Sequence, residues 1–272
     1  MIPVVVLIFA TNIVVIVHLA RSGRFRHPGN WFTAALYISD LLVGASSIGT
    51  NVTSTYETSL DLCLLRLGLL LAAIVSSIIF LLLIAVDRFL AITRALTYVT
   101  LMTSRVVTIA IVVTVAACLL IGVAPLAGWT HYHYSSHCSF AYVLETSYIV
   151  FILVGSLIPI CVILIIYLYL FNKARLHIRK IESLNALHHV RSGSWPLGVS
   201  SKGWRCIRQL VVLVGCLLVT WSPFILASIV DIALDGAPCW LKDVIGTHLL
   251  LLGMTNSILN PLVYTVGTRD FR

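Results

Sequence analysis

The chain has 272 residues, of which 60% are hydrophobic and only 10% are charged, and its mean hydropathy is +1.04. A soluble fold of this length cannot hide so much apolar surface, so lipid must cover part of it. The formal net charge of +8 would be compatible with a nucleic-acid partner, but the placement of the basic residues points to membrane topology instead.

Seven apolar segments are long enough to cross a bilayer at roughly 20 residues per helix. No basic region or small-residue cleavage site precedes the first segment, so we expect a retained helix rather than a signal peptide. Internal repeats are not detectable, which argues against an inverted-repeat transporter. The sequence predicts an all-α membrane protein with one seven-transmembrane domain, residues 1–272, and spans at about 2–20, 30–50, 63–90, 105–128, 145–172, 206–233 and 243–266.

The basic residues define an orientation. If the N-terminus is outside, 16 of the 18 Lys and Arg residues fall on the inner side, and only Arg66 and Lys242 lie near the outer side. The positive-inside rule therefore predicts an outer N-terminus and a cytoplasmic C-terminus. The long inner loop from Lys173 to about Arg205 has basic flanks, which are expected to continue the fifth and sixth helices. The charge is topological, and no nucleic-acid partner is expected.

Asp40 lies in the middle of the second segment, where an isolated carboxylate is costly and usually functional. Ser77 in the third segment and Asn256, Ser257 and Asn260 in the seventh offer neutral oxygens. A carboxylate among such oxygens suits a small hard cation, so we predict an allosteric sodium site. The alternative is a protonated aspartate in a hydrogen-bond network without an ion.

The cysteine count is seven. Cys63 opens the third segment and Cys138 lies in the loop before the fifth, so this pair can join loop to helix where disulfides are permitted. Cys239 would then remain unpaired on the outer side. Four further cysteines are expected to act as small hydrophobic residues: Cys118, Cys161, Cys206 and Cys216.

The inner end of the third segment carries Asp87-Arg88-Phe89. Cys63 and Arg88 are separated by about 37 Å of helix at ~1.5 Å per residue, so one end is pinned outside while the other meets the cytoplasm. The arginine can pair with its neighbouring carboxylate at rest and release it when a partner protein arrives. Simple positive-inside anchoring would explain Arg88 but not Asp87.

Prolines interrupt three of the long segments, at positions 159, 223 and 261. A proline frees a backbone carbonyl and kinks a helix. Trp221 stands two residues before Pro223, and Tyr264 stands three after Pro261, in the sequence Asn260-Pro261-Leu262-Val263-Tyr264. These two sites are therefore predicted to be switch points.

In this order the motifs resemble those of the class A (rhodopsin-like) G-protein-coupled receptors, over essentially the whole chain. The resemblance implies a multi-pass plasma-membrane receptor, not an enzyme, which binds an extracellular small molecule and activates a heterotrimeric G protein, with sodium as an allosteric ion and no other cofactor. It assigns coupling and switching to a set of inner and middle residues: Asp87, Arg88, Leu96, Tyr167, Trp221, Pro223, Asn260, Pro261 and Tyr264. The other landmarks are Asn12, Asp40, Cys63 and Pro159.

The chain departs from the family pattern at several positions. Val115 replaces the usual tryptophan of the fourth span, Phe89 replaces a tyrosine, and Ala95 stands where a proline is frequent. No acidic residue lies near Gly203 at the base of the sixth span, so the usual lock to Arg88 is expected to be absent. By analogy with the family, this would raise basal activity.

The resemblance places the ligand between the outer halves of spans three, five, six and seven. Leu70 occupies the position of the amine-receptor aspartate and Met254 that of the retinal lysine, which excludes those ligands. Arg66 would meet a headgroup or pair with a nearby acid. The predicted pocket suits a lipid or a flat aromatic molecule and consists of Arg66, Leu67, Leu70, Leu71, Ile74, Phe140, Trp221, Phe224 and Leu250.

Within the family, the segments 62–66, 138–140 and 221–224 with 251–257 look closest to a receptor for acylethanolamides and lysophospholipids that couples to the stimulatory class of G protein. The wider cannabinoid, lysophospholipid, melanocortin and adenosine cluster is the fallback. An adenosine-like or other small-molecule ligand is the alternative. A seven-span transporter or a membrane hydrolase is the alternative outside the receptors, but a hydrolase needs clustered His, Asp or Glu at membrane depth.

Three histidines, His131, His133 and His137, crowd the loop before Cys138. They can bind zinc or sense protons between about pH 5 and 8, or they simply form a polar exposed loop.

Overall fold

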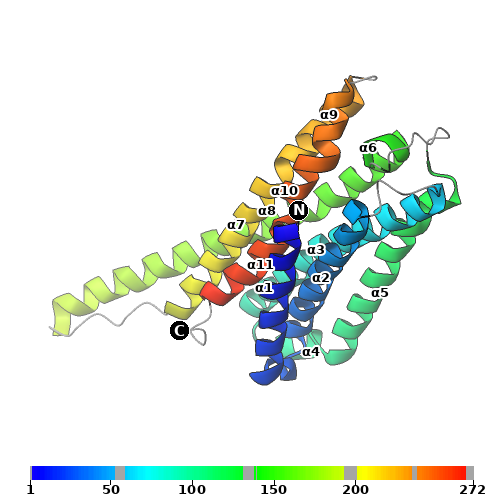
Figure 1. Ribbon diagram of the computed structural model, residues 1–272. Coiled ribbons are helices and arrows are strands. Elements are labelled where there is room, and N and C mark those ends of the chain that lie inside the picture. The colour runs from blue at the N-terminus through cyan, green and yellow to red at the C-terminus, as the bar shows by residue number, and fades with distance from the viewer. Residues whose placement is uncertain are drawn as a thin grey trace.

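The computed structural model describes residues 2–52, 59–130, 138, 140–192, 201–234 and 238–267, with side chains described except at 49–52, 177–192, 201–210 and 264–267. The described part is a helical bundle (Figure 1), which confirms the predicted all-α seven-helix class. Its α-helices are α1 (Ile2–Arg21), α2 (Gly29–Val52), α3 (Leu60–Thr93), α4 (Tyr98–Leu101), α5 (Ser104–Val123), α6 (Phe140–Val143), α7 (Thr146–Ser192), α8 (Ser201–Ala233), α9 (Cys239–Val244), α10 (Leu250–Met254) and α11 (Asn256–Gly267).

Six of these helices are long and apolar enough to cross a membrane, namely α1, α2, α3, α5, α7 and α8. The seventh apolar segment is divided instead of forming one helix. It runs through α9, a π-helical turn (Ile245–Leu249), α10 and α11. None of these pieces alone is long enough to count as a membrane-spanning helix, although together they are consecutive in the chain. A π-turn of this kind often lies at a functional site.

Helix α3 forms the centre of the bundle, where it packs against α2, α5 and α7. Gly68 on α3 and Gly122 on α5 let two backbones approach closely. A Cβ added at Gly122 would lie 2.6 Å from the carbonyl oxygen of Gly68, a distance that atoms cannot adopt without movement. Small residues at a crossing are the usual way to pack helices in lipid, because hydrophobic attraction between them is weak there.

Two prolines leave carbonyls that side chains then satisfy. Pro261 has no N–H to donate to Ser257, four residues earlier, and Asn12 Nδ2 on α1 donates to the Ser257 carbonyl at 2.9 Å. Pro125 likewise cannot donate to Ile121, and the Tyr148 hydroxyl donates to that carbonyl at 2.9 Å. These bonds tie α1 to α11 and α5 to α7 at the places where the helices are weakest.

The basic flanks of the long inner loop are helical, as expected. Helix α7 continues to Ser192 and α8 begins at Ser201. Figure 1 shows the end of α7 projecting well past the other helices. On this stretch the guanidinium of Arg175 lies 5.2 Å from the centre of the Phe171 ring, a cation–π distance.

Candidate functional site

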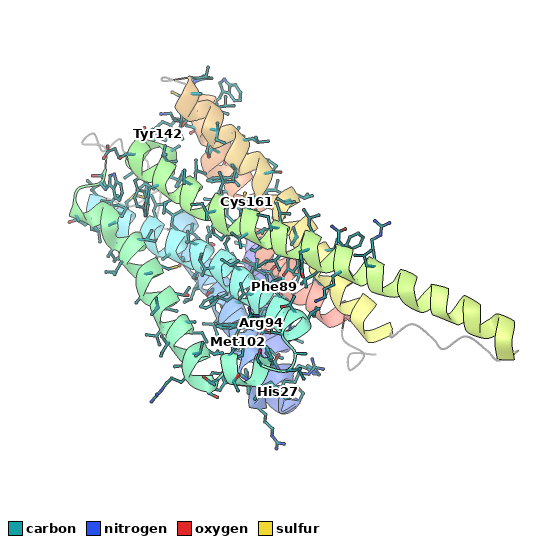
Figure 2. All side chains as sticks on the ribbon, turned by 180° about the vertical axis from the view of Figure 1, so that it is seen from behind. His27, Phe89, Arg94, Met102, Tyr142 and Cys161 are labelled. Carbon is teal, nitrogen blue, oxygen red and sulfur yellow. A yellow bond between two sulfur atoms is a disulfide. The ribbon has the colours of Figure 1, made fainter. Side chains whose placement is uncertain are left out.

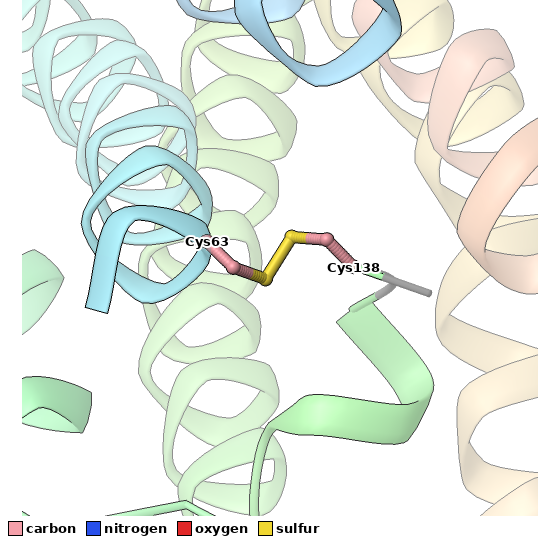
Figure 3. Close-up of a disulfide and its surroundings, with 2 residues drawn as sticks. All are labelled: Cys63 and Cys138. Carbon is pink, nitrogen blue, oxygen red and sulfur yellow. A yellow bond between two sulfur atoms is a disulfide. The ribbon is translucent and has the colours of Figure 1, made fainter. Parts of the chain in front are cut away.

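A disulfide lies at the end of the bundle where α3 begins, which is the outer end in the orientation that the positive-inside rule predicts. Cys63 at the start of α3 is bonded to Cys138, with their Cα atoms 5.8 Å apart (Figure 3), and α6 begins two residues after Cys138. Cys239 is exposed and free. The predicted pairing is therefore present, and it fixes α6 beside the outer end of α3.

Helix α6 is also bonded to the far side of the bundle. The Tyr142 hydroxyl lies 3.2 Å from both the Cys239 carbonyl and an Asp243 carboxylate oxygen, and Lys242 Nζ lies 5.8 Å from the Tyr142 ring centre. Figure 2 shows Tyr142 at the end of the bundle opposite Arg94 and Met102. Since the disulfide holds α6 to α3 and Tyr142 holds it to α9, this short helix bridges the outer ends of α3 and α9.

Under α6 lies an apolar cavity between α3, α7, α8 and α10. Phe140 and Phe224 meet in it with their ring centres 5.7 Å apart. The cavity measures about 30 Å³, room for only a water molecule or two, so a larger ligand must displace side chains. Six predicted residues line it: Leu71, Ile74, Phe140, Trp221, Phe224 and Leu250.

The other predicted pocket residues lie elsewhere. Arg66, Leu67 and Leu70 are buried in α3 but are not part of this cavity lining. Sequence reasoning missed the contribution of α7 and the deeper turn of α3. The missed residues are Val75, Ile78, Ile152, Leu153, Ser156, Ile160 and Ile225. The four-residue and three-residue spacing from Leu71 to Ile78 could have revealed the α3 part.

A second, larger cavity lies between α3, α5 and α7. Its volume is about 270 Å³, and two of its residues, Val113 and Phe151, are strongly exposed on the bundle surface. Val75 and Ile152 line both cavities. Only these two side chains are common to both walls, so the inner cavity and the surface groove are close neighbours.

The floor of the inner cavity is the predicted switch on α8. The Trp221 ring stands edge-on to Phe224, with centres 5.7 Å apart. Gly253 on α10 packs against the same indole, since a Cβ there would lie 2.8 Å from Trp221 Cζ3. Any larger residue would push α8 and α10 apart, so this contact couples the two helices through one ring.

Asp40 is fully buried on α2 and collects three hydrogen bonds. Ser77 Oγ donates to Oδ1 at 2.9 Å, Ser257 Oγ donates to the same oxygen at 2.8 Å, and Asn260 Nδ2 donates to Oδ2 at 3.0 Å. Four of the five predicted residues are thus brought together. Asn256 is also buried, and the side-chain amide oxygens (Oδ1) of Asn256 and Asn260 have no hydrogen-bond partner among the described residues.

At the inner end of α3, Asp87 is held from two sides. Arg88 Nε lies 3.5 Å from Asp87 Oδ2, and the Tyr98 hydroxyl on α4 donates to Oδ1 at 2.6 Å. Burial, and then the bond to Asp87, raises the pKa of Tyr98 to about 12, so the phenol remains a donor at neutral pH. Sequence reasoning did not find Tyr98. A tyrosine ten residues after the arginine carries no pattern of its own.

The remaining inner residues are placed as follows. Leu96 is fully exposed and Tyr167 is buried. Pro223 lies within α8, and Pro261 lies within α11.

Some predicted residues cannot be placed. The Tyr264 side chain lies outside the described residues, as does the loop of His131, His133 and His137. Figure 2 shows Phe89, Arg94 and Met102 toward the end of the bundle opposite Tyr142. Among the described residues, no three His, Cys, Asp or Glu side chains form a group able to hold a metal.

Comparison with known proteins identifies the class. The profile of the 7 transmembrane receptor (rhodopsin family) matches residues 11–264, and the chain belongs to this family. It is accordingly a multi-pass plasma-membrane receptor and not an enzyme.

Individual relatives narrow the position within the family. The chain is 31% identical to the glucose-dependent insulinotropic receptor of Rattus norvegicus over 98% of this chain and 58% of that protein. For the Homo sapiens receptor of the same name the figures are 28%, 98% and 81%. Lysophosphatidic acid receptor 3 of Homo sapiens is 28% identical over 97% of this chain and 72% of its own length. The chain thus spans little more than half of the rat relative.

Proposed function

We propose that this receptor binds an extracellular lipid-like ligand, an acylethanolamide or a lysophospholipid, and activates a heterotrimeric G protein of the stimulatory class. The observation that carries the proposal is the apolar cavity beneath α6, whose lining consists of aliphatic and aromatic residues apart from Ser156. Relatives named for lysophosphatidic acid and sphingosine 1-phosphate support a lipid ligand. The charge pattern of the chain supports an outer N-terminus and a cytoplasmic C-terminus.

A lipid tail needs more space than the inner cavity offers. The neighbouring groove between α3, α5 and α7 supplies about 270 Å³ of apolar space, and Val75 and Ile152 stand at the boundary. Rotamer changes of two aliphatic side chains cost little compared with burying an alkyl chain, which gains about 0.8 kcal/mol per CH₂. The acyl chain therefore lies across this boundary, with its headgroup toward α6.

Ligand contact is transmitted through Trp221. A tail that pushes on Phe224 or Trp221 acts on Gly253 and α10 through the same indole contact. Pro223 interrupts the hydrogen-bond ladder of α8 two residues further on, so the inner part of α8 can swing outward. This exposes Arg88, which is 36% exposed and paired only weakly with Asp87, to the G protein. A preference of a few kcal/mol for the open state is enough to shift the population.

The Asp40 cluster supports a sodium site. Such an ion prefers hard oxygen donors. The cluster offers the Asp40 carboxylate, the hydroxyls of Ser77 and Ser257, and the buried side-chain amide oxygens of Asn256 and Asn260, which have no partner among the described residues. When bound, the ion would neutralise the Asp40 charge. The cluster joins α2, α3 and α11, so it opposes separation of these helices and favours the resting arrangement.

The first test measures G-protein activation in cells, without ligand and then with oleoylethanolamide or lysophosphatidylcholine, across the stimulatory, inhibitory and Gq classes. Stimulatory coupling that rises severalfold with either lipid is the expected result. A response to adenosine with none to lipid would move the ligand to another branch. Good surface expression with no coupling to any class would refute the proposed function and leave only the family.

Asp40→Asn is expected to abolish the effect of sodium on the receptor. In the wild type, replacing potassium by sodium at constant ionic strength should raise the melting temperature of the purified receptor, because an ion that binds the folded state stabilises it. The variant keeps the side-chain shape but loses the charge, so its melting temperature should be the same in both salts. A variant that still responds to sodium would rule out this site.

A further inference from the structure

Two polar side chains on the outer half of α8, buried Ser228 and partly buried Asp231, each have one buried oxygen without a hydrogen-bond partner among the described residues. Ser228 is 3% exposed, and neither its Oγ nor the Oδ1 atom of Asp231 has a hydrogen-bond partner within the part of the chain that the structure describes. A buried hydroxyl or carboxylate oxygen without a donor costs roughly 1–3 kcal/mol or more. A ligand that carries hydrogen-bond donors can satisfy both of these atoms.

Ser228 and Asp231 are not part of the cavity lining, but they lie further along the face of α8 that lines it. At 100° per residue, Ser228 lies 40° and Asp231 20° from Phe224 around the helix axis, values that follow from 3.6 residues per turn. Phe224 and Trp221 line the cavity, so all four residues share one face of α8. At ~1.5 Å per residue, Ser228 lies about 6 Å and Asp231 about 10 Å beyond Phe224 toward the outer end.

The elements around this face supply charges of both signs. Arg66 is buried near the outer end of α3, and Lys242 and Asp243 lie on α9, which contacts α8. Asp243 is occupied by the Tyr142 hydroxyl, and the Lys242 ammonium faces the Tyr142 ring. Among the described residues, neither charge on α9 forms an ion pair with Asp231.

We infer that Ser228 and Asp231 form the headgroup subsite of the ligand pocket, and that this subsite takes an uncharged headgroup bearing N–H or O–H donors, such as the amide and hydroxyl of an acylethanolamide. The inference rests on the proposed lipid ligand and selects among its classes. Two acceptor oxygens accept two donors, and the tail then extends past Phe224 into the apolar cavity. A phosphate monoester brings further acceptors and negative charge next to Asp231, and like charges in a site of low dielectric repel strongly.

The subsite predicts a ligand preference that differs from the phosphate-bearing lipids after which two relatives are named. Lysophosphatidic acid is therefore expected to be at least tenfold less potent here than oleoylethanolamide, a ratio equivalent to about 1.4 kcal/mol. Equal or greater potency of lysophosphatidic acid at the wild type would overturn the inference.

The test pairs protein variants with ligand variants. Concentration–response curves for stimulatory G-protein activation are recorded with oleoylethanolamide and with N,N-dimethyloleamide, which keeps the tail but has no N–H or O–H donor. Ser228→Ala and Asp231→Asn should each weaken oleoylethanolamide about tenfold or more. Neither should weaken the dimethylamide by more than about twofold. The coupling between variant and ligand isolates the headgroup contact from any general effect on folding.

The control is Asp61→Asn, the same substitution at an exposed acid in the first turn of α3, which should leave both curves unchanged. Equal weakening of both lipids by Asp231→Asn would mean that Asp231 supports the helix and not the headgroup, and the subsite would be refuted. If the wild type answers no lipid while its basal coupling is intact, the proposed lipid ligand fails, and the subsite inference fails with it. If the wild type responds to oleoylethanolamide and the variants respond to it equally well, the subsite alone is refuted.

Discussion

Arg88→Ala is expected to abolish G-protein nucleotide exchange while the receptor still reaches the cell surface. Arg88 is partly exposed at the inner end of α3, and its nearest carboxylate, Asp87, is separately held by the Tyr98 hydroxyl. Removing the guanidinium therefore leaves Asp87 with a donor and does not orphan a buried charge. A charge-assisted contact to the partner is worth up to about 3 kcal/mol, so exchange should fall roughly 100-fold.

The measurement is nucleotide exchange on purified G protein in membranes with matched receptor density. Arg94→Ala is the matched control, since Arg94 lies six residues further on at the end of α3 and is exposed. Arg94→Ala should retain most of the exchange activity, because removing a generally placed positive charge weakens association only modestly. Persistent exchange in Arg88→Ala, or equal loss in both variants, would contradict the role given to Arg88.

The sequence predicted those site residues whose chemistry is unusual for a membrane. A carboxylate, an amide and a proline in hydrocarbon are expensive, so Asp40 and the Asn260-Pro261 pair stand out without any coordinates. The structure places Asn260 3.0 Å from Asp40. The disulfide of Cys63 with Cys138 could also be predicted, because each cysteine borders an outer loop.

The apolar residues of the cavity could not be selected in the same way. The membrane-spanning part of α7 is apolar on every side apart from a few small polar residues, so nothing in its sequence distinguishes the cavity residues Ile152 and Leu153 from those that face lipid. Contacts between distant loops carry no local pattern either. Tyr142 and Tyr98 are ordinary loop tyrosines in the sequence, and only the folded chain brings them to Asp243 and Asp87.

The division of the seventh segment was equally hidden. Residues 243–266 have the composition of a continuous span, yet the chain forms a π-turn at Ile245–Leu249 and begins a new helix at Asn256. The π-turn itself packs against α6 and α8, and such contacts between distant segments cannot be predicted from the local sequence. An apolar composition is enough to place a segment in the bilayer, but its local helix geometry also depends on packing against neighbouring helices.

Loss of the outer disulfide is expected to be the most damaging change to ligand response. In the double variant Cys63→Ser/Cys138→Ser, α6 keeps only its bonds to α9, so Phe140 is no longer fixed against Phe224. The bond joins residues 75 apart, and chain entropy for a loop of that length corresponds to about 4.5 kcal/mol in a soluble chain. The transmembrane helices restrict the conformations of the unfolded chain, so about 4.5 kcal/mol is an upper bound on the stabilisation by this disulfide. We expect a melting temperature several degrees lower and at least a tenfold loss of lipid potency.

Cys239→Ser is the control that makes this result specific. Cys239 is exposed and free, and it lies beside the Tyr142 contact on the same outer side. Because only its backbone carbonyl accepts from Tyr142, replacing the thiol should change neither the melting temperature nor the potency. Thermal unfolding of purified receptor and concentration–response curves should be recorded for both variants. If Cys239→Ser proved as damaging as the double variant, Cys239 would be part of the functional pairing, and α6 would be tied to α9 by a covalent bond instead of to α3.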